Sequence, residues 1–122
     1  NEFKGSSGLN PYADFVRHVD ADVGRLMAKL EQLGLRENTL IVFTADNGCS
    51  PAAKIEELQA KGHEPSYLYR GHKADIFEGG HRVPFIVRWP AKVKPGSVNP
   101  QLIGQIAVAV RIVTLQKRVL CI

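Results

Sequence analysis

Apolar residues recur at intervals of three and four along the first quarter of the chain, which places them on one side of a helix. They are Tyr12, Phe15, Val16, Val19, Val23, Leu26, Met27, Leu30 and Leu33. Asn10 is suited to cap this helix, Pro11 to occupy its first position, and Gly34 to end it. The opposite face carries Asp14, Asp20, Asp22, Arg25 and Lys29, where solvated charge is expected. The pattern predicts one amphipathic helix of about six turns.

An uninterrupted apolar run, Leu40 to Phe43, follows after a connection of four residues and reads as a strand buried on both faces. A helix, a short loop and a buried strand form an α/β unit. Asp46, Asn47 and Gly48 come directly afterwards, at the sheet edge where such folds bind ligands. Carboxylate and amide oxygens suit Ca²⁺ or Mg²⁺. Taken alone, an Asp-Asn-Gly sequence is more often only a turn.

The middle of the chain has weaker patterns. Residues 52–61 are compatible with a short helix whose apolar face is Ile55 and Leu58, and residues 62–69 mix Gly, Pro and aromatic residues as a loop does. Residues 83–89 predict a second strand, with Pro84 near its start, where a missing N–H donor is tolerated. A turn-rich exit loop, residues 92–100, follows that strand.

Between these elements, residues 70–82 combine glycines at 71, 79 and 80 with a dense set of charged side chains. Lys73 lies in this glycine-bounded loop and is a candidate anion contact, because an ammonium offers three donors to an oxyanion. On composition alone, a solvated loop lysine is an equally good interpretation.

Composition limits the class of protein. The 122 residues suffice for one domain, and the 44% apolar content is typical of a soluble globular protein. A formal net charge of +4 favours anionic partners, but it is too small to imply nucleic acid, and no nucleic-acid-binding motif accompanies it. No membrane span is expected, since the most apolar stretch, residues 106–115, is ten residues long and contains Arg111. The first residues show no apolar leader segment. Cys49 and Cys121 form no metal motif, and the sequence leaves open whether they pair.

Three stretches in order resemble the formylglycine-dependent sulfatases, which are arylsulfatase-like members of the alkaline-phosphatase-like hydrolases. They are VRHVDADVGRLMAKLEQLGLRENT, LIVFTADNG and GHKADIFEGGHRVPFIVRWP, and the resemblance covers Tyr12 to Val98. It implies an α/β fold, a fragment of an alkaline-phosphatase-like mixed sheet sandwiched by helices. Residues 1–9 would then be a flexible arm or cut loop, residues 10–100 a partial catalytic domain from its C-terminal part, and residues 101–122 a divergent or truncated tail.

The resemblance also implies roles for individual residues. Asp46 and Asn47 match two Ca²⁺ ligands, with Mg²⁺ as the alternative ion, and Lys73 matches the catalytic lysine that contacts the sulfate ester and its leaving-group oxygen. His72 adjoins Lys73 and is an additional candidate for substrate binding. The matching scaffold residues are Glu78, Gly79, Gly80, Arg82 and Pro84, of which the acid and the arginine would hydrogen-bond the loop in place. The implied substrates are sulfated small molecules or polysaccharides, and the implied location is secreted, periplasmic or lysosomal.

The sequence departs from the family pattern at the nucleophile. The Cys-x-Pro-x-Arg or Ser-x-Pro-x-Arg motif, whose first residue becomes formylglycine, is absent from these residues. Cys49 has Pro51 two positions later, but Ala53 stands where the arginine is required, so Cys49 is not the nucleophile. Formylglycine is therefore expected in a missing N-terminal half, and we expect no sulfatase activity from this chain alone.

The residues after Val98 depart as well, because they lack the family's Asp and Pro-Thr pair and lose its register near Gly104. Residues 106–115 are apolar and β-prone enough to be an aggregation hazard.

Two other functions remain open. The first is a phosphoesterase or phosphonate hydrolase of the same superfamily, against which Asn47 argues, because a histidine there would favour it. The second is a non-enzymatic basic module that binds sulfated polyanions. Calcium-dependent stabilisation would favour an enzyme fragment, whereas salt-sensitive heparin binding without calcium would favour the module.

Overall fold

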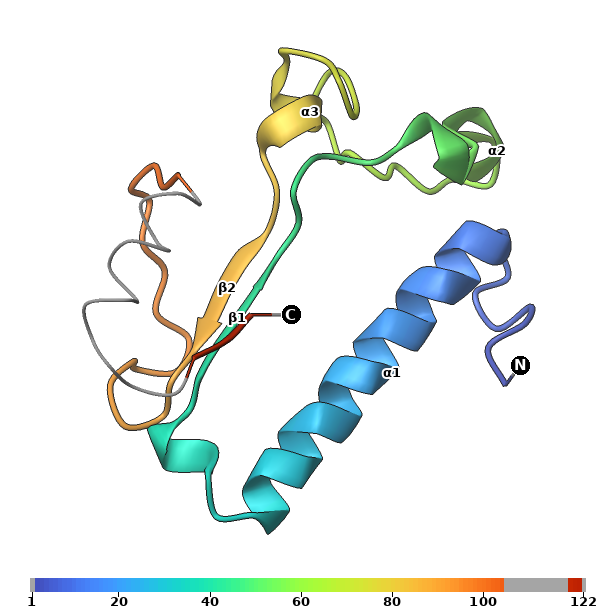
Figure 1. Ribbon diagram of the computed structural model, residues 1–122. Coiled ribbons are helices and arrows are strands. Elements are labelled where there is room, and N and C mark those ends of the chain that lie inside the picture. The colour runs from blue at the N-terminus through green and yellow to red at the C-terminus, as the bar shows by residue number, and fades with distance from the viewer. Residues whose placement is uncertain (1, 105–118, 122) are drawn as a thin grey trace. The chain divides into compact units, whose positions relative to one another are not determined.

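A computed structural model describes residues 2–104 and 119–121 as a small α/β protein (Figure 1). In chain order, its helices and strands are α1 (Pro11–Gln32), β1 (Leu40–Thr44), α2 (Ile55–Ala60), α3 (Glu78–His81), β2 (Phe85–Arg88) and β3 (Val119–Cys121), with 3₁₀ turns η1 (Arg36–Asn38) and η2 (Pro51–Ala53). The described residues fall into two compact units, one within Asn1–Leu26 and Thr44–Phe85 and the other within Met27–Phe43 and Ile86–Ile122. None of the described helices is both long and apolar enough to span a bilayer.

Helix α1 begins and ends where the sequence predicts. The Asn10 side-chain oxygen accepts a hydrogen bond from the Ala13 N–H (3.0 Å), which satisfies one of the free donors of the first turn. At the other end, Gly34 has φ +65°, and the Leu35 N–H donates to the Leu30 carbonyl oxygen (2.9 Å). This left-handed glycine closes the helix as predicted.

The burial of α1 differs from the expectation of a solvated charged face. Asp14 is the one buried residue of this helix, whereas Phe15 and Val16 are 59% and 54% exposed. The Asp14 carboxylate accepts hydrogen bonds from the Gly5 N–H (2.6 Å) and the Ser7 N–H (2.8 Å). Bonds from Ser7 and then Gly5 lower the pKa of Asp14 below its ordinary value. The expectation of a solvated side chain was therefore wrong for Asp14, because the preceding segment folds onto it.

That preceding segment is the one expected to be a flexible arm or cut loop. Residues 2–9 form hydrogen-bonded turns, in which the Ser6 N–H donates to the Phe3 carbonyl oxygen (3.0 Å) and the Gly8 N–H to the Gly5 carbonyl oxygen (3.3 Å). Together with the two bonds to Asp14, these turns give the segment a defined local structure.

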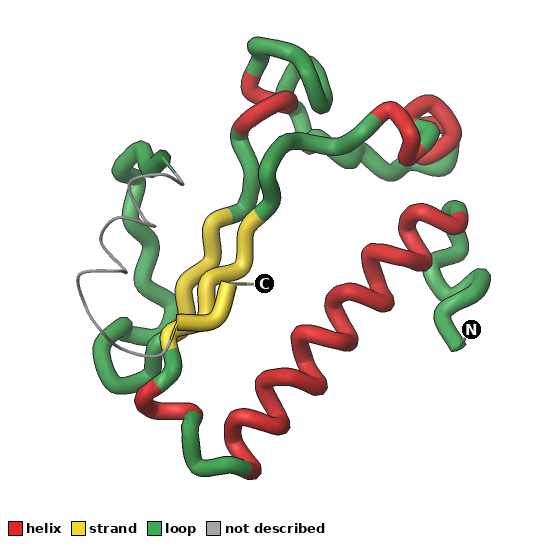
Figure 2. Tube along the Cα trace, in the orientation of Figure 1, coloured by secondary structure: helices red, strands yellow, loops and turns green. Residues whose placement is uncertain are grey.

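The sheet has the order β2-β1-β3, with β2 antiparallel to β1 and β3 parallel to it (Figures 1 and 2). In the β1–β3 register, Leu40 lies opposite Val119 and Val42 opposite Cys121. The predicted strands are confirmed, since β1 contains residues 40–43 and β2 lies within residues 83–89, directly after Pro84. In β1, Ile41 and Val42 are buried, while Phe43 is only partly so. The apolar stretch 106–115 lies outside the described residues.

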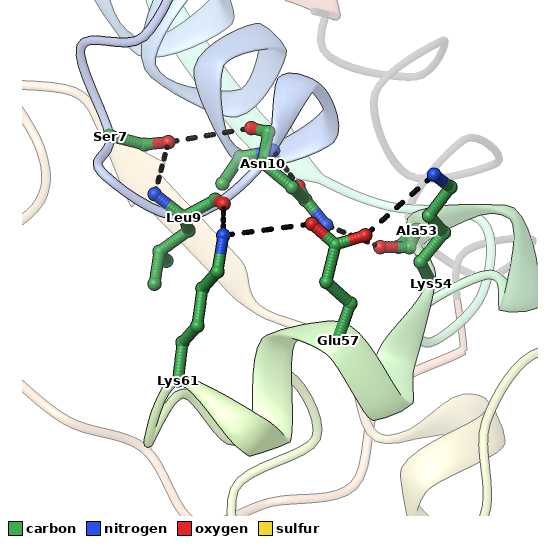
Figure 3. A network of polar contacts seen from close by, with 8 residues as sticks. Ser7, Leu9, Asn10, Ala53, Lys54, Glu57 and Lys61 are labelled. Atoms are coloured by element: carbon green, nitrogen blue, oxygen red, sulfur yellow. Dashed lines mark hydrogen bonds and ion pairs between the residues drawn. The ribbon is translucent and has the colours of Figure 1, made fainter.

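A polar network joins the start of α1 to η2 and α2 (Figure 3). The Asn10 side-chain amide donates to the Ala53 carbonyl oxygen (2.9 Å), and the Lys61 ammonium donates to the Leu9 carbonyl oxygen. Leu58, on the expected apolar face of α2, and Ala53 are both buried here. The helix predicted over residues 52–61 is shorter than expected, because Lys54 adopts a left-handed conformation (φ 55°) between η2 and α2.

Candidate functional site

The turn after β1 presents two oxygen-bearing side chains side by side. The Asn47 side-chain amide donates to the Gly48 carbonyl oxygen (2.9 Å), which leaves its Oδ1 as an acceptor. Asp46 is exposed, and its carboxylate has no hydrogen bond or ion pair within residues 2–104. The turn therefore offers a carboxylate and an amide oxygen, a donor set that fits a hard divalent cation.

Two backbone hydrogen bonds fasten this turn to the lysine loop, residues 70–82. The Gly48 N–H donates to the Gly80 carbonyl oxygen (2.9 Å), and the Lys73 N–H donates to the Cys49 carbonyl oxygen (2.9 Å). The residues in each pair are more than twenty positions apart in the sequence. The main chain of Lys73 therefore lies against the turn that carries Asp46 and Asn47. The Lys73 side chain itself is exposed.

The glycines at this junction have no room for a side chain. A Cβ on Gly48 would lie 1.8 Å from the Gly79 carbonyl oxygen, one on Gly79 would lie 2.1 Å from the Gly71 carbonyl oxygen, and one on Gly80 would lie 2.2 Å from that of Asp75. Gly79 and Gly80 are also buried. Close approach of three backbone segments therefore requires glycine here.

Glu78 and Arg82 hold the end of the same loop. The Arg82 Nη1 donates to the Glu78 Oε2 (2.8 Å) across helix α3, and the Arg82 guanidinium lies over the Tyr69 ring, 4.6 Å from its centroid. This hydrogen bond is the main cause that lowers the pKa of Glu78 and raises that of Arg82. The two residues were expected to hydrogen-bond the loop, whereas the hydrogen bond seen here joins them to each other.

His72, the additional candidate, is already engaged by its neighbours. Its backbone N–H donates to the Asp75 Oδ2 (2.9 Å), its Nδ1 lies 3.0 Å from the Lys73 carbonyl oxygen, and its ring lies 3.5 Å from the Asp75 carboxylate. His72 therefore makes its contacts with residues of its own loop.

A cavity of about 750 Å³ lies between α2 and residues 64–72. Gly71 and His72 line it, but Asp46, Asn47 and Lys73 do not. Sequence reasoning missed Tyr67 and Tyr69, which also line it. The one signal that could have drawn attention to them was the aromatic content of a long loop next to the lysine.

The described residues contain no cluster of three or more His, Cys, Asp or Glu side chains that could hold a metal ion. Asp46 and Asn47 provide two oxygens, whereas Ca²⁺ takes roughly six to eight. Cys49 is a free, partly buried thiol, and burial raises its pKa above the ordinary value. A raised pKa disfavours the thiolate form. The side chain of Cys121 lies outside the described residues.

Comparisons with known proteins identify the family. The sulfatase family model matches residues 1–115, so the chain belongs to the sulfatase family. The chain is 39% identical over 119 residues to the N-acetylgalactosamine-6-O-sulfatase of Bacteroides thetaiotaomicron, covering 95% of this chain and 23% of that protein. It is 44% identical over 98 residues to rat steryl-sulfatase (78% and 16%), and 39% identical over 94 residues to human arylsulfatase A (77% and 17%). The chain therefore spans between about a sixth and a quarter of the length of these relatives.

Proposed function

We propose that this chain supplies part of the active site of a sulfuric ester hydrolase, with Asp46 and Asn47 as calcium ligands and Lys73 as the contact to the sulfate ester. Mg²⁺ is the alternative ion. The observation that carries the proposal is the junction of the turn and the lysine loop, through the Gly48–Gly80 and Cys49–Lys73 backbone hydrogen bonds. The proposal includes an alkaline-phosphatase-like fold, which the β1 turn at the sheet edge supports.

The proposed hydrolysis depends on the charges of the sulfate ester and of the groups around it. A sulfate monoester resists hydrolysis because its anionic oxygens repel a nucleophile and its leaving alkoxide is poor. A bound divalent cation supplies Lewis acidity, which polarises the ester. The Lys73 ammonium neutralises negative charge that develops on the bridging oxygen, provided that it reaches that atom in the complete site. The Asp46 carboxylate and the Asn47 amide oxygen orient and hold the cation.

The nucleophile in this proposal comes from a segment other than these 122 residues, as formylglycine in a Cys-x-Pro-x-Arg or Ser-x-Pro-x-Arg motif. The relatives act on sulfated N-acetylgalactosamine or sterols, as their names state, and a sulfated small molecule or polysaccharide is the substrate proposed here. The purified chain should give no turnover of a chromogenic sulfate ester, and measurable turnover that survives repurification would contradict this division of the site.

Calcium binding tests the metal ligands directly. On titration with CaCl₂, the backbone amide NMR signals of Asp46 to Cys49 should shift, with a weak, millimolar affinity because two of roughly six to eight ligands are present. Asp46→Ala should abolish these shifts. The matched control is Asp20→Ala, since Asp20 is an exposed carboxylate on α1. Shifts that persist in Asp46→Ala, or that are equally large around Asp20, would refute the assignment.

Inorganic sulfate tests Lys73 in the same way. Sulfate should shift the amide signals of His72 to Ala74, and Lys73→Ala should weaken the response several-fold because an ammonium donor is lost. Lys92→Ala removes an exposed lysine of the exit loop and should leave the response unchanged. If heparin instead binds without calcium and both lysine variants weaken it equally, the basic-module alternative is favoured over a specific sulfate contact.

A further inference from the structure

Lys73 lies in a tight reverse turn made by residues 72–75. The Asp75 N–H donates to the His72 carbonyl oxygen (2.9 Å), which is the hydrogen bond that closes a β-turn. Ala74 has φ +77° and is the one residue of this turn with a positive φ. A positive φ at the third position alone is the mark of a type II turn, so Lys73 occupies the second position of such a turn.

Alanine is an unusual residue at that third position. A type II turn generally has glycine or asparagine there, because a Cβ disfavours a positive φ. Ala74 therefore stores backbone strain. A strained conformation of this kind persists only where neighbouring contacts enforce it, and such residues are concentrated at functional sites. The contacts that hold Ala74 in this conformation thus bear on the lysine that precedes it.

The Asp75 carboxylate supplies one of these contacts. Its Oδ2 accepts a hydrogen bond from the His72 N–H (2.9 Å), so a side chain closes the turn a second time. The same side chain lies against the main chain of Gly71, because a Cβ added to Gly71 would be 3.0 Å from both the Asp75 Cβ and its Oδ2. Two hydrogen bonds of opposite direction between His72 and Asp75 therefore hold the two residues between them.

The main chain of Lys73 is engaged at both of its polar groups. Its N–H donates to the Cys49 carbonyl oxygen (2.9 Å). Its carbonyl oxygen lies 3.0 Å from the His72 Nδ1 and can only accept, so Nδ1 is the donor in this contact. A lysine ammonium stands at the end of a flexible four-carbon stem. Fixing the backbone from which that stem starts narrows the positions that the ammonium can take.

We infer that Asp75 is a positioning residue for Lys73, because its carboxylate keeps residues 72–75 in the turn from which the lysine reaches the sulfate ester. The inference rests on the proposed function, since it takes Lys73 as the contact to the ester. Asp75 is an acid and repels an anion, so direct binding of sulfate does not explain an aspartate two positions from that lysine. The hydrogen bond that it accepts does explain it, and a neutral acceptor of the same shape would serve equally well.

Sulfate titrations of two matched variants, followed by NMR on the full chain, test the inference. Asp75→Asn and Asp75→Ala remove the same negative charge, but only Asp75→Asn keeps an oxygen that can accept the His72 N–H. Asp75→Ala should bind inorganic sulfate about threefold or more weakly than Asp75→Asn, because its lysine is no longer preorganised. Equal sulfate affinities in the two variants would overturn the inference.

Ala74→Gly provides a rescue that depends on the conformation of the turn. Glycine takes a positive φ without strain, so adding Ala74→Gly to Asp75→Ala should recover most of the lost sulfate affinity. Gly24→Ala is the matched control, because it favours helix α1 at an exposed position and does not touch the turn. No recovery with Ala74→Gly, or equal recovery with Gly24→Ala, would overturn the inference, since the effect of Asp75 would then not act through the turn.

Lys73→Ala separates this inference from the proposed function. If Lys73→Ala leaves the sulfate affinity of the chain unchanged, the proposed contact fails and the inference falls with it. If Lys73→Ala weakens sulfate binding while Asp75→Ala and Asp75→Asn bind equally well, the inference fails alone.

Amide hydrogen exchange follows the turn itself. The Lys73 N–H, bonded to the Cys49 carbonyl oxygen, should stay protected in both variants at position 75, which shows that the junction is folded. The N–H of residue 75 should exchange faster in Asp75→Ala than in Asp75→Asn, because the turn opens more readily without the side-chain acceptor. Equal exchange rates at this position would contradict the role given to the carboxylate.

Discussion

Two neighbouring regions, the junction of the Gly48 turn with the lysine loop and the wall of the cavity, are stabilised by different kinds of contact. At the junction, backbone N–H groups of Gly48 and Lys73 donate to backbone oxygens, and glycines permit the close approach. At the cavity wall, the contacts are between side chains: Tyr67 and Tyr69 meet edge to face, and behind them the Arg82 guanidinium lies over the Tyr69 ring and is hydrogen-bonded to Glu78. A backbone junction tolerates few substitutions, whereas residues that meet through side chains can be exchanged while the junction keeps its geometry.

The largest expected effect is at the junction. Gly79→Ala would place a Cβ 2.1 Å from the Gly71 carbonyl oxygen. The main chain would have to shift to relieve this clash. Overpacking of this kind costs about 1–3 kcal/mol, and here the clash is with main chain. The free energy of unfolding, measured by urea denaturation, should fall accordingly.

Gly24→Ala is the control for that substitution. Gly24 is an exposed residue of α1, and a Cβ added to it would meet no atom within 4 Å beyond the backbone of its own helix. Alanine in a helix is favoured over glycine by up to about 1 kcal/mol, so this variant should be as stable as the unchanged chain or more so. If both glycine variants behave alike, the close approach at Gly79 does not constrain the loop.

A smaller effect is expected at the cavity wall. Arg82→Ala removes both the contact with the Tyr69 ring and the hydrogen bond to Glu78, yet Arg82 is exposed, so stability should change less than in Gly79→Ala. The Tyr69 ring signals should move, while the Gly48 amide signal stays in place. Arg36→Ala is the control, because Arg36 forms an exposed pair with Glu31 at the same 2.8 Å distance. Movement of the Gly48 signal in Arg82→Ala would show that wall and junction are not independent.

The smallest expected effect is a pH dependence confined to the wall. The hydrogen bond from Arg82 lowers the pKa of Glu78 below the ordinary value of 4.5. The pair therefore contributes its full stabilisation above about pH 4.5, and this contribution is lost as the pH falls through the lowered pKa. The Tyr69 ring signals should therefore change as the pH falls below about 4.5. Glu78→Gln should abolish this transition, and a transition that persists would point to another acid.

Local sequence patterns were sufficient to predict helix α1, strands β1 and β2, and the sulfatase family. Helix α1 and its caps follow from residue spacing, Asn10 and Gly34, and β1 follows from the apolar run before Asp46. The helical turn α3 escaped prediction, because two glycines in four residues carry no helical signal. The cavity escaped as well, since its lining comes from residues spread over twenty-two positions without any periodicity.

The sequence by itself determined helix α1, strands β1 and β2, the Asp-Asn-Gly turn and the membership of the sulfatase family, because spacing, capping and motif order are local properties. Tertiary structure decided that the Gly48 turn lies against Gly80, that Asp14 is buried under the residues before it, and that Tyr69 stands beneath Arg82. These are contacts between positions seven to thirty-two apart, and they form only when the connecting chain folds back. No local sequence pattern predicts these contacts, because each depends on how closely residues distant in the sequence approach one another in the folded chain.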